Sequence, residues 1–149
     1  MIFAAGLGTR LRPLTDNMPK ALVPVAGKTM LERVILKLKD AGFHDITINI
    51  HHFGSQIIDF LRANQNFGVD IHISDERGEL LDTGGGIKKA RPLLESNEPF
   101  LIHNADILTD LDLNAFYHHH LESDADATLL TNHRKTSRYL LMNQDNRLC

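Results

Sequence analysis

Residues 3–20 read Phe-Ala-Ala-Gly-Leu-Gly-Thr-Arg-Leu-Arg-Pro-Leu-Thr-Asp-Asn-Met-Pro-Lys, and this stretch decides the fold. A short apolar run ends abruptly in a loop bracketed by Gly6 and Gly8. Small residues let backbone N–H groups approach an anion closely, and successive N–H groups in a tight turn form an anion-binding concavity. Arg10, Arg12 and Lys20 add positive charge to the same segment. The stretch therefore predicts a strand followed by a phosphate-binding loop.

Two other glycine motifs do not fit this sequence. A dinucleotide-binding fingerprint needs a third glycine for close packing of its helix, and Leu11 occupies that position. Its helix would open at the glycines, whereas Pro13 and Pro19 keep the segment irregular. Residues 27–29 imitate the end of a P-loop, but the leading glycine would fall on Leu22. Residues 27–29 are therefore interpreted as a turn that leads into a helix.

The segment from Ala4 to Val25 resembles the signature of the sugar-1-phosphate nucleotidyltransferases, also called nucleotide-sugar pyrophosphorylases. The resemblance is carried by Gly6-Leu7-Gly8-Thr9-Arg10, by Pro13, and by Pro19-Lys20 at fixed spacing. The Thr-Gly-Gly-Gly run at 83–86 is similar to the subgroup that acts on N-acetylmuramate-1-phosphate or mannose-1-phosphate. The resemblance implies a Mg²⁺-dependent enzyme whose partners are an NTP and a sugar-1-phosphate. It favours UTP slightly over GTP.

The resemblance also implies a role for individual residues. The backbone from Ala5 to Gly8 would face the nucleoside, while Thr9 and Arg10 would meet the β- and γ-phosphates. Arg10 and Lys20 are expected to be catalytic. The expected nucleotide-binding residues are Ala5, Gly6, Gly8, Thr9, Glu76, Gly84 and Gly85. An alternative stays open for each of two segments. The glycines at 84–86 would form a flexible turn, as glycine clusters often do, and Glu76 would be a solvated loop residue, as most acidic loop residues are.

Asp106 is the predicted metal ligand. It follows an apolar run at 100–102, and Mg²⁺ prefers carboxylate oxygens and usually bridges protein to substrate phosphates. Family members carry glycine where this chain has Ala105, so the match departs from the pattern there. Asp110 and Asp112 are interpreted as a turn and a helix N-terminus. The family takes its second metal-binding aspartate from a later part of its sequence.

Apolar spacing along the chain alternates between the periods of strands and helices. After the first strand, further strands are predicted at 46–50, 69–73, 100–102, 127–131 and 138–143. Helices are predicted from the Thr29–Glu32 capping box to Gly42, around 57–61, after the glycines at 84–86, and at 113–121, with Pro92 ending or kinking the third. This alternation predicts an α/β fold, a Rossmann-like three-layer sandwich with a mostly parallel, mixed sheet.

Ligands in such folds bind at the carboxyl ends of the strands. The glycine loop, the region of Glu76 and Asp106 all follow predicted strands, so we expect them to converge at one edge of the sheet. The half-hairpin at 138–149 predicts that residues 1–149 are the N-terminal nucleotide-binding part of a single nucleotidyltransferase domain, truncated at its C-terminus.

Length and composition narrow the class of protein. The chain has 149 residues, 42% apolar and 23% charged, as in one globular domain. No apolar run approaches the length of a membrane-spanning helix, which is about 20 residues. The net charge of −3 argues against a nucleic-acid partner. The lone Cys149 fits a cytoplasmic protein, and a homo-oligomer is compatible with the sequence.

Two alternative functions remain at this stage. One is cytidylyl transfer to a non-sugar phosphate such as phosphocholine, which shares the glycine loop. The other is a non-catalytic nucleotide-binding module that keeps the fold. The presence of Arg10, Lys20 and Asp106 together argues against the second, since a purely structural relative need not keep all three.

Overall fold

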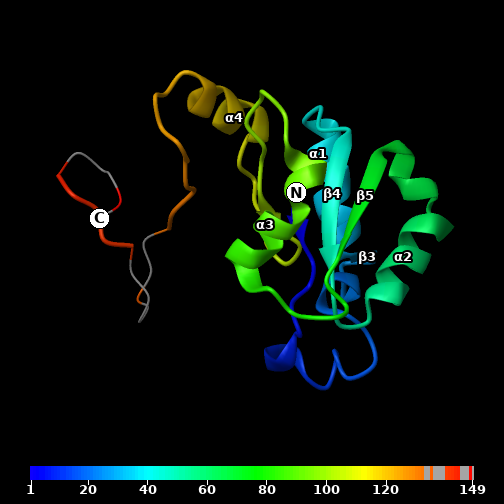
Figure 1. Ribbon diagram of the computed structural model, residues 1–149. Coiled ribbons are helices and arrows are strands. Elements are labelled where there is room, and N and C mark those ends of the chain that lie inside the picture. Colours follow the sequence, from blue (N-terminus) through cyan, green and yellow to red (C-terminus); the bar gives the residue numbers. More distant parts are fainter. Residues whose placement is uncertain (133–134, 136–139, 145–147, 149) are drawn as a thin grey trace.

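The computed structural model describes residues 1–132, 135, 140–144 and 148. Its main sheet has parallel strands in the order β5-β4-β1-β6 (Figure 1). These strands are β1 (Ile2–Phe3), β4 (Asp45–Ile50), β5 (Asp70–Asp75) and β6 (His103–Asn104). A short antiparallel ribbon of β2 (Pro24–Val25) and β3 (Lys28–Thr29) precedes the first helix. The predicted α/β class is confirmed.

Four α-helices accompany the sheet in the described part of the chain: α1 (Met30–Asp40), α2 (Gly54–Ala63), α3 (Asp82–Leu94) and α4 (Leu113–Leu121). Three 3₁₀ turns, Thr9–Leu11, Lys20–Leu22 and Gln65–Gly68, complete the regular structure. Within the described residues, none of the helices has the length and apolar character needed to cross a bilayer.

Helix α1 forms where the capping box predicts it. The Thr29 side chain accepts a hydrogen bond from the Glu32 backbone N–H at 3.1 Å, which satisfies a donor that the helix itself leaves unpaired. The buried residues are the predicted ones: Met30, Leu31, Val34, Ile35 and Leu38. Gly42 follows with φ +86°, a left-handed conformation that glycine adopts at low cost and that ends the helix.

Replacing Thr29 with alanine is expected to lower the free energy of unfolding by about 1 kcal/mol, because the Glu32 N–H loses its acceptor. Thr29→Ser keeps the oxygen and is the matched control, with a loss well below that of Thr29→Ala. Urea unfolding of the full-length protein measures both. Equal losses in the two variants would show that the methyl group, not the cap, stabilises this position.

The two faces of β4 meet different helices. Ile46, Ile48 and Ile50 belong to the main hydrophobic cluster, which also contains most of the buried residues of α1 and α2. Asn49 points to the other face, where a Cβ on Gly86 of α3 would lie 3.2 Å from its Nδ2 atom. The sheet is therefore covered on both faces, as a three-layer sandwich requires.

Several predicted boundaries are wrong for physical reasons. The strand expected at 100–102 lies at His103–Asn104 instead, because its partner β1 offers only Ile2 and Phe3 for pairing. Phe100 and Ile102 are exposed rather than buried.

No strand forms at 127–131, where no neighbouring strand pairs with the chain among the described residues. Leu129 and Leu130 are 53% and 59% exposed. Of the strand expected at 138–143, residues 138–139 lie outside the described residues. The part that is described shows one antiparallel bridge, between Met142 and Leu148, rather than a strand.

Helix α3 begins earlier than predicted. It starts at Asp82, so the glycines at 84–86 lie inside its first turns rather than in a loop before it. Pro92 does not end the helix but lies in its last turn, which continues to Leu94. The glycine cluster is thus part of a packed helix and not a flexible turn.

Candidate functional site

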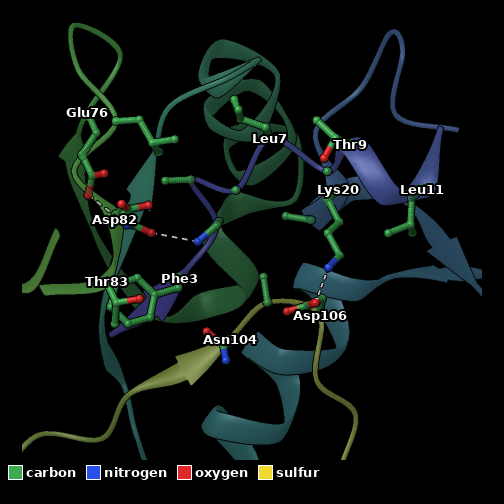
Figure 2. A pocket seen from close by; sticks show the side chains of 18 of the residues that line it. Phe3, Leu7, Thr9, Leu11, Lys20, Glu76, Asp82, Thr83, Asn104 and Asp106 are labelled. Atoms are coloured by element: carbon green, nitrogen blue, oxygen red, sulfur yellow. Dashed lines mark hydrogen bonds and ion pairs between the residues drawn. The ribbon is translucent and has the colours of Figure 1, made fainter. Parts of the chain in front are cut away.

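A cavity of about 380 Å³ opens at the carboxyl ends of the four parallel strands. Its lining comes from the glycine loop, from Lys20 and Ala21, and from the ends of β4, β5 and β6. Figure 2 shows Lys20 and Asp106 facing each other on one side, with Glu76, Asp82 and Thr83 on the other. The structure therefore brings the predicted segments to one edge of the sheet.

The glycine loop is held in place by its own downstream residues. Gly8 has φ +68°, and a Cβ there would lie 3.0 Å from Thr15 Cγ2. The buried Thr15 hydroxyl donates to the Gly8 carbonyl oxygen at 2.8 Å. At Gly6 an added Cβ would meet nothing within 4 Å, so its backbone stays open to the cavity. Gly8 is needed for the turn itself, whereas Gly6 leaves room in front of it.

Lys20 and Asp106 form an ion pair at the cavity wall. The Lys20 ammonium group donates to Asp106 Oδ2, across 86 residues of sequence. The two side chains are 26% and 37% exposed, so both charges remain accessible to a ligand. Arg10 also lines the cavity, in the turn that follows Gly8. The cavity thus presents two cations, together with the Asp106 carboxylate beside Lys20, a charge pattern suited to a polyphosphate with a divalent cation.

Glu76 lies at the opposite end, just after β5, and is fully buried. Its Oε1 accepts a hydrogen bond from Asn49 Nδ2 at 2.8 Å, while its Oε2 has no hydrogen-bond partner among the described residues. A buried acceptor without a donor is costly, and functional sites are where such groups are found. Because Glu76 lines the cavity, its unpaired Oε2 marks a position at the site where a hydrogen-bond donor is lacking among the described residues.

Most predicted site residues line this cavity, namely Ala5, Gly6, Gly8, Thr9, Arg10, Lys20, Glu76 and Asp106. Gly84 and Gly85 do not line it; Asp82 and Thr83 of the same helix do so instead. The reason is the early start of α3, which turns its first residues toward the loop and the glycines away from it. Arg12 pairs with Asp16 at 3.5 Å and is also outside the lining.

Asn49, like Asp82 and Thr83, lines the cavity but was not among the predicted site residues. The sequence analysis treats it only as part of the strand at 46–50, whereas in the structure it is 1% exposed because α3 covers it. The signal available in the sequence was an asparagine near the carboxyl end of a strand flanked by isoleucines.

Two titratable side chains near the cavity, those of Asp75 and His103, have shifted pKa values with causes inside the protein. Arg77 donates side-chain and backbone hydrogen bonds to Asp75, which lower the pKa of that exposed carboxyl to about 2. His103 is buried beside β1, and desolvation holds its pKa below the ordinary value, which favours the neutral ring. Asp75 and His103 do not line the cavity.

Gly86 fixes the distance between α3 and the sheet. A Cβ at this position would lie 2.9 Å from Glu76 Oε1 and 3.4 Å from a ring carbon of Phe3. We expect Gly86→Ala to lower the free energy of unfolding by about 1–2 kcal/mol, since overpacking outweighs the better helix propensity of alanine. Gly84→Ala, where a Cβ meets nothing within 4 Å, is the matched control and is expected to leave stability unchanged or raise it. Urea unfolding of the full-length protein compares the two, and equal stability would contradict the close packing.

The donor set fits a cation that a ligand brings, rather than one held by the protein alone. Among the described residues, no group of three or more His, Cys, Asp or Glu side chains is placed to hold a metal ion. Of the carboxylates that line the cavity, Asp106 lies beside Lys20, whereas Glu76 and Asp82 lie on the other side (Figure 2). One carboxylate next to Lys20 matches the way Mg²⁺ is usually bound, through one or two carboxylates and substrate phosphates.

Comparison with known proteins gives a consistent result. Residues 1–148 match the family described as nucleotidyl transferase. The chain is 48% identical over 117 residues to an N-acetylmuramate alpha-1-phosphate uridylyltransferase of Neisseria meningitidis serogroup B, covering 78% of this chain and 50% of that protein. It is 39% identical over 125 residues to a mannose-1-phosphate guanyltransferase of Gibberella zeae, covering 80% and 34%.

Among solved structures, HddC from Yersinia pseudotuberculosis, crystallised with GMP-PN, is similar with a TM-score of 0.73 at 33% identity. That match covers 83% of this chain and 54% of HddC. The chain therefore spans about half the length, or less, of the proteins that it resembles.

Proposed function

The chain belongs to the nucleotidyl transferase family, and we propose that it is the nucleotide-binding part of an enzyme making nucleotide sugars in the cytoplasm. The reaction transfers NMP from an NTP to a sugar-1-phosphate and releases pyrophosphate. UTP is the proposed donor, supported by the 48% identity to a uridylyltransferase, with GTP next because of the guanyltransferase relative.

The observation that carries this proposal is the meeting of the glycine loop, Lys20 and Asp106 at one cavity. In the reaction, an oxygen of the sugar-1-phosphate attacks the α-phosphorus, and the bond to the bridging oxygen of pyrophosphate breaks. Arg10 and Lys20 neutralise the negative charge that builds up on the departing pyrophosphate. Charge neutralisation and alignment are the main tasks of a protein in such transfers.

At the nucleoside end, the backbone from Ala5 to Gly8 packs against the ribose and base, and the free Oε2 of Glu76 accepts a hydrogen bond from the base. Uracil offers the imide N–H as a donor for this oxygen. Gly84 and Gly85 act indirectly, by letting α3 begin with Asp82 and Thr83 at the cavity. Asp106 is the proposed protein ligand of Mg²⁺, which when bound with the nucleotide offsets phosphate charge.

A pyrophosphate-release screen of the full-length enzyme tests the proposal. The screen crosses the four common NTPs with a panel of sugar-1-phosphates and with phosphocholine. We expect the highest kcat/KM for UTP with a sugar-1-phosphate. Turnover of CTP with phosphocholine alone would replace the proposal by its first alternative. NTP binding with no pyrophosphate from any pair would support a non-catalytic module.

We also propose that residues 1–149 form one part of a single nucleotidyltransferase domain. An apolar groove of about 940 Å³ runs between α3, β6 and α4, and the exposed Phe100, Ile102 and Ile107 line it. The matches cover only 50% and 34% of the two relatives' lengths, and we propose that a further segment of the enzyme covers the groove.

The 149 residues alone are expected to turn over at less than about 1% of the full-length rate, because part of the acceptor site is missing, which costs the positioning that such reactions need. The measurement is pyrophosphate release by equal amounts of the fragment and of the full-length enzyme, with circular dichroism as the control for folding. Full activity of a folded fragment would contradict both the domain assignment and the missing acceptor site.

A further inference from the structure

We propose that Asn49 is a positioning residue that orients the Glu76 carboxylate toward the base, using the backbone N–H of Ala4 as its fixed reference. The inference rests on the proposed function, in which Glu76 contacts the nucleobase. In this role Asn49 does not recognise the ligand itself but determines whether position 76 presents a hydrogen-bond acceptor or a donor to the cavity.

Asn49 bridges two segments of the site that are distant in sequence. The Ala4 N–H donates to Asn49 Oδ1 at 2.8 Å, and Asn49 Nδ2 donates to Glu76 Oε1 at 2.8 Å. These bonds span 45 and 27 residues of sequence and link the ends of β1, β4 and β5. Asn49 is 1% exposed and Glu76 is fully buried, so water does not compete for the bonds.

The two hydrogen bonds from Ala4 through Asn49 to Glu76, called the relay below, have a direction that is set by the backbone. A backbone N–H can only donate, so the carbonyl oxygen of Asn49 must face Ala4 and its amino group must face Glu76. Whatever occupies position 76 must then offer an acceptor toward Asn49. With glutamate there, both oxygens can accept: Oε1 takes the hydrogen bond from Asn49, and Oε2 has no partner among the described residues, in a side chain that lines the cavity.

The surroundings leave the Glu76 carboxylate little freedom to turn. Gly86 lies directly against the carboxylate, since a Cβ added at Gly86 would lie 2.9 Å from Glu76 Oε1. His51 Nδ1 lies 2.6 Å from the backbone oxygen of Glu76 and holds the main chain. Orientation at this point therefore depends on the hydrogen bond with Asn49.

The same argument predicts what happens when hydrogen-bond donors and acceptors are exchanged at positions 49 and 76. In Glu76→Gln, the amide oxygen at position 76 must serve Asn49, so the amino group faces the cavity and meets the imide N–H of uracil as donor against donor. In the double variant Asn49→Asp with Glu76→Gln, the carboxylate at 49 accepts from both Ala4 and the new amide. The amide oxygen then faces the cavity, and the acceptor for the base is restored.

Binding of UTP and CTP to the full-length enzyme, measured by calorimetry, together with KM and kcat, tests the relay. We expect Glu76→Gln to weaken UTP binding about 10- to 100-fold, with a smaller change in kcat, and to lower the UTP-to-CTP affinity ratio. Asn49→Asp alone places two carboxylates together without a donor and is expected to weaken UTP binding by at least as much. The double variant should recover UTP affinity and the ratio to within a few-fold of wild type. Gly78→Ala, where a Cβ meets nothing within 4 Å, is the control and should bind UTP as wild type does.

Each outcome decides a question. If wild-type enzyme binds no UTP, the proposed function is overturned. If it binds UTP but the folded double variant binds no better than Glu76→Gln, the role of Asn49 is overturned. Should Asn49→Asp fail to fold alone, the comparison of Glu76→Gln with the double variant still applies. Should the double variant also fail to fold, an unchanged UTP-to-CTP ratio in Glu76→Gln overturns the inference, and a lowered ratio supports it.

Discussion

Replacing Lys20 with alanine in the full-length enzyme is expected to lower kcat/KM for the proposed reaction by about a thousandfold. Two unit charges about 4 Å apart, at an effective dielectric constant near 20, interact by about 4 kcal/mol. That energy corresponds to about three powers of ten in rate. Because the charge on pyrophosphate grows as the bond breaks, we expect most of the loss in kcat rather than in KM.

The fold should survive this change. The Lys20–Asp106 pair is partly exposed, and such pairs contribute about 0–1 kcal/mol to stability. Lys28→Ala is the matched control, since Lys28 pairs with Glu32 at 3.6 Å and does not line the cavity. Steady-state kinetics and the thermal midpoint of both variants are compared with wild type. A Lys20→Ala enzyme with wild-type kcat/KM would remove this lysine from the mechanism.

Replacing Asp106 with asparagine is expected to have an effect of similar size, a loss of about 10²- to 10³-fold in kcat/KM at fixed Mg²⁺. The amide is nearly isosteric but neutral, so it is a much weaker ligand for a hard divalent cation. Part of the activity should return as the Mg²⁺ concentration is raised. The measurement is pyrophosphate release as a function of Mg²⁺ concentration, with Mn²⁺ binding in the presence of UTP as a second readout.

Asp110→Asn is the control for Asp106→Asn, because Asp110 lies on the same connection but outside the cavity lining. We expect it to keep the wild-type Mg²⁺ dependence. If Asp106→Asn also kept that dependence and its rate, the carboxylate would have no part in cation binding. The two cavity residues therefore have separate tests, one on charge at the phosphates and one on the metal.

The sequence predicted best those elements whose signals are local. The cap at Thr29, the apolar stripe of α1 and the alternating isoleucines of β4 depend on neighbouring residues, and the structure has all three. The convergence of the glycine loop, Glu76 and Asp106 was also predictable, because each follows a strand that ends at one edge of a parallel sheet.

The wrong predictions concern elements that depend on distant partners. A strand at 127–131 needs a neighbour to pair with, and apolar alternation alone does not supply one. The edge strand β6 takes its bounds from β1, which is only Ile2–Phe3 in length. The start of α3 at Asp82 likewise reflects its packing on β4 and β5, which the local sequence does not show.

The amino-acid order by itself specified an α/β chain with a glycine loop after its first strand, because propensity, capping and periodicity act over a few residues. The tertiary structure alone determines that α3 buries Asn49, that Ala4 fixes the orientation of its amide, and that one oxygen of Glu76 has no hydrogen-bond partner among the described residues. Hydrogen-bond direction in a buried site is set by partners far apart in sequence, and no local pattern encodes it.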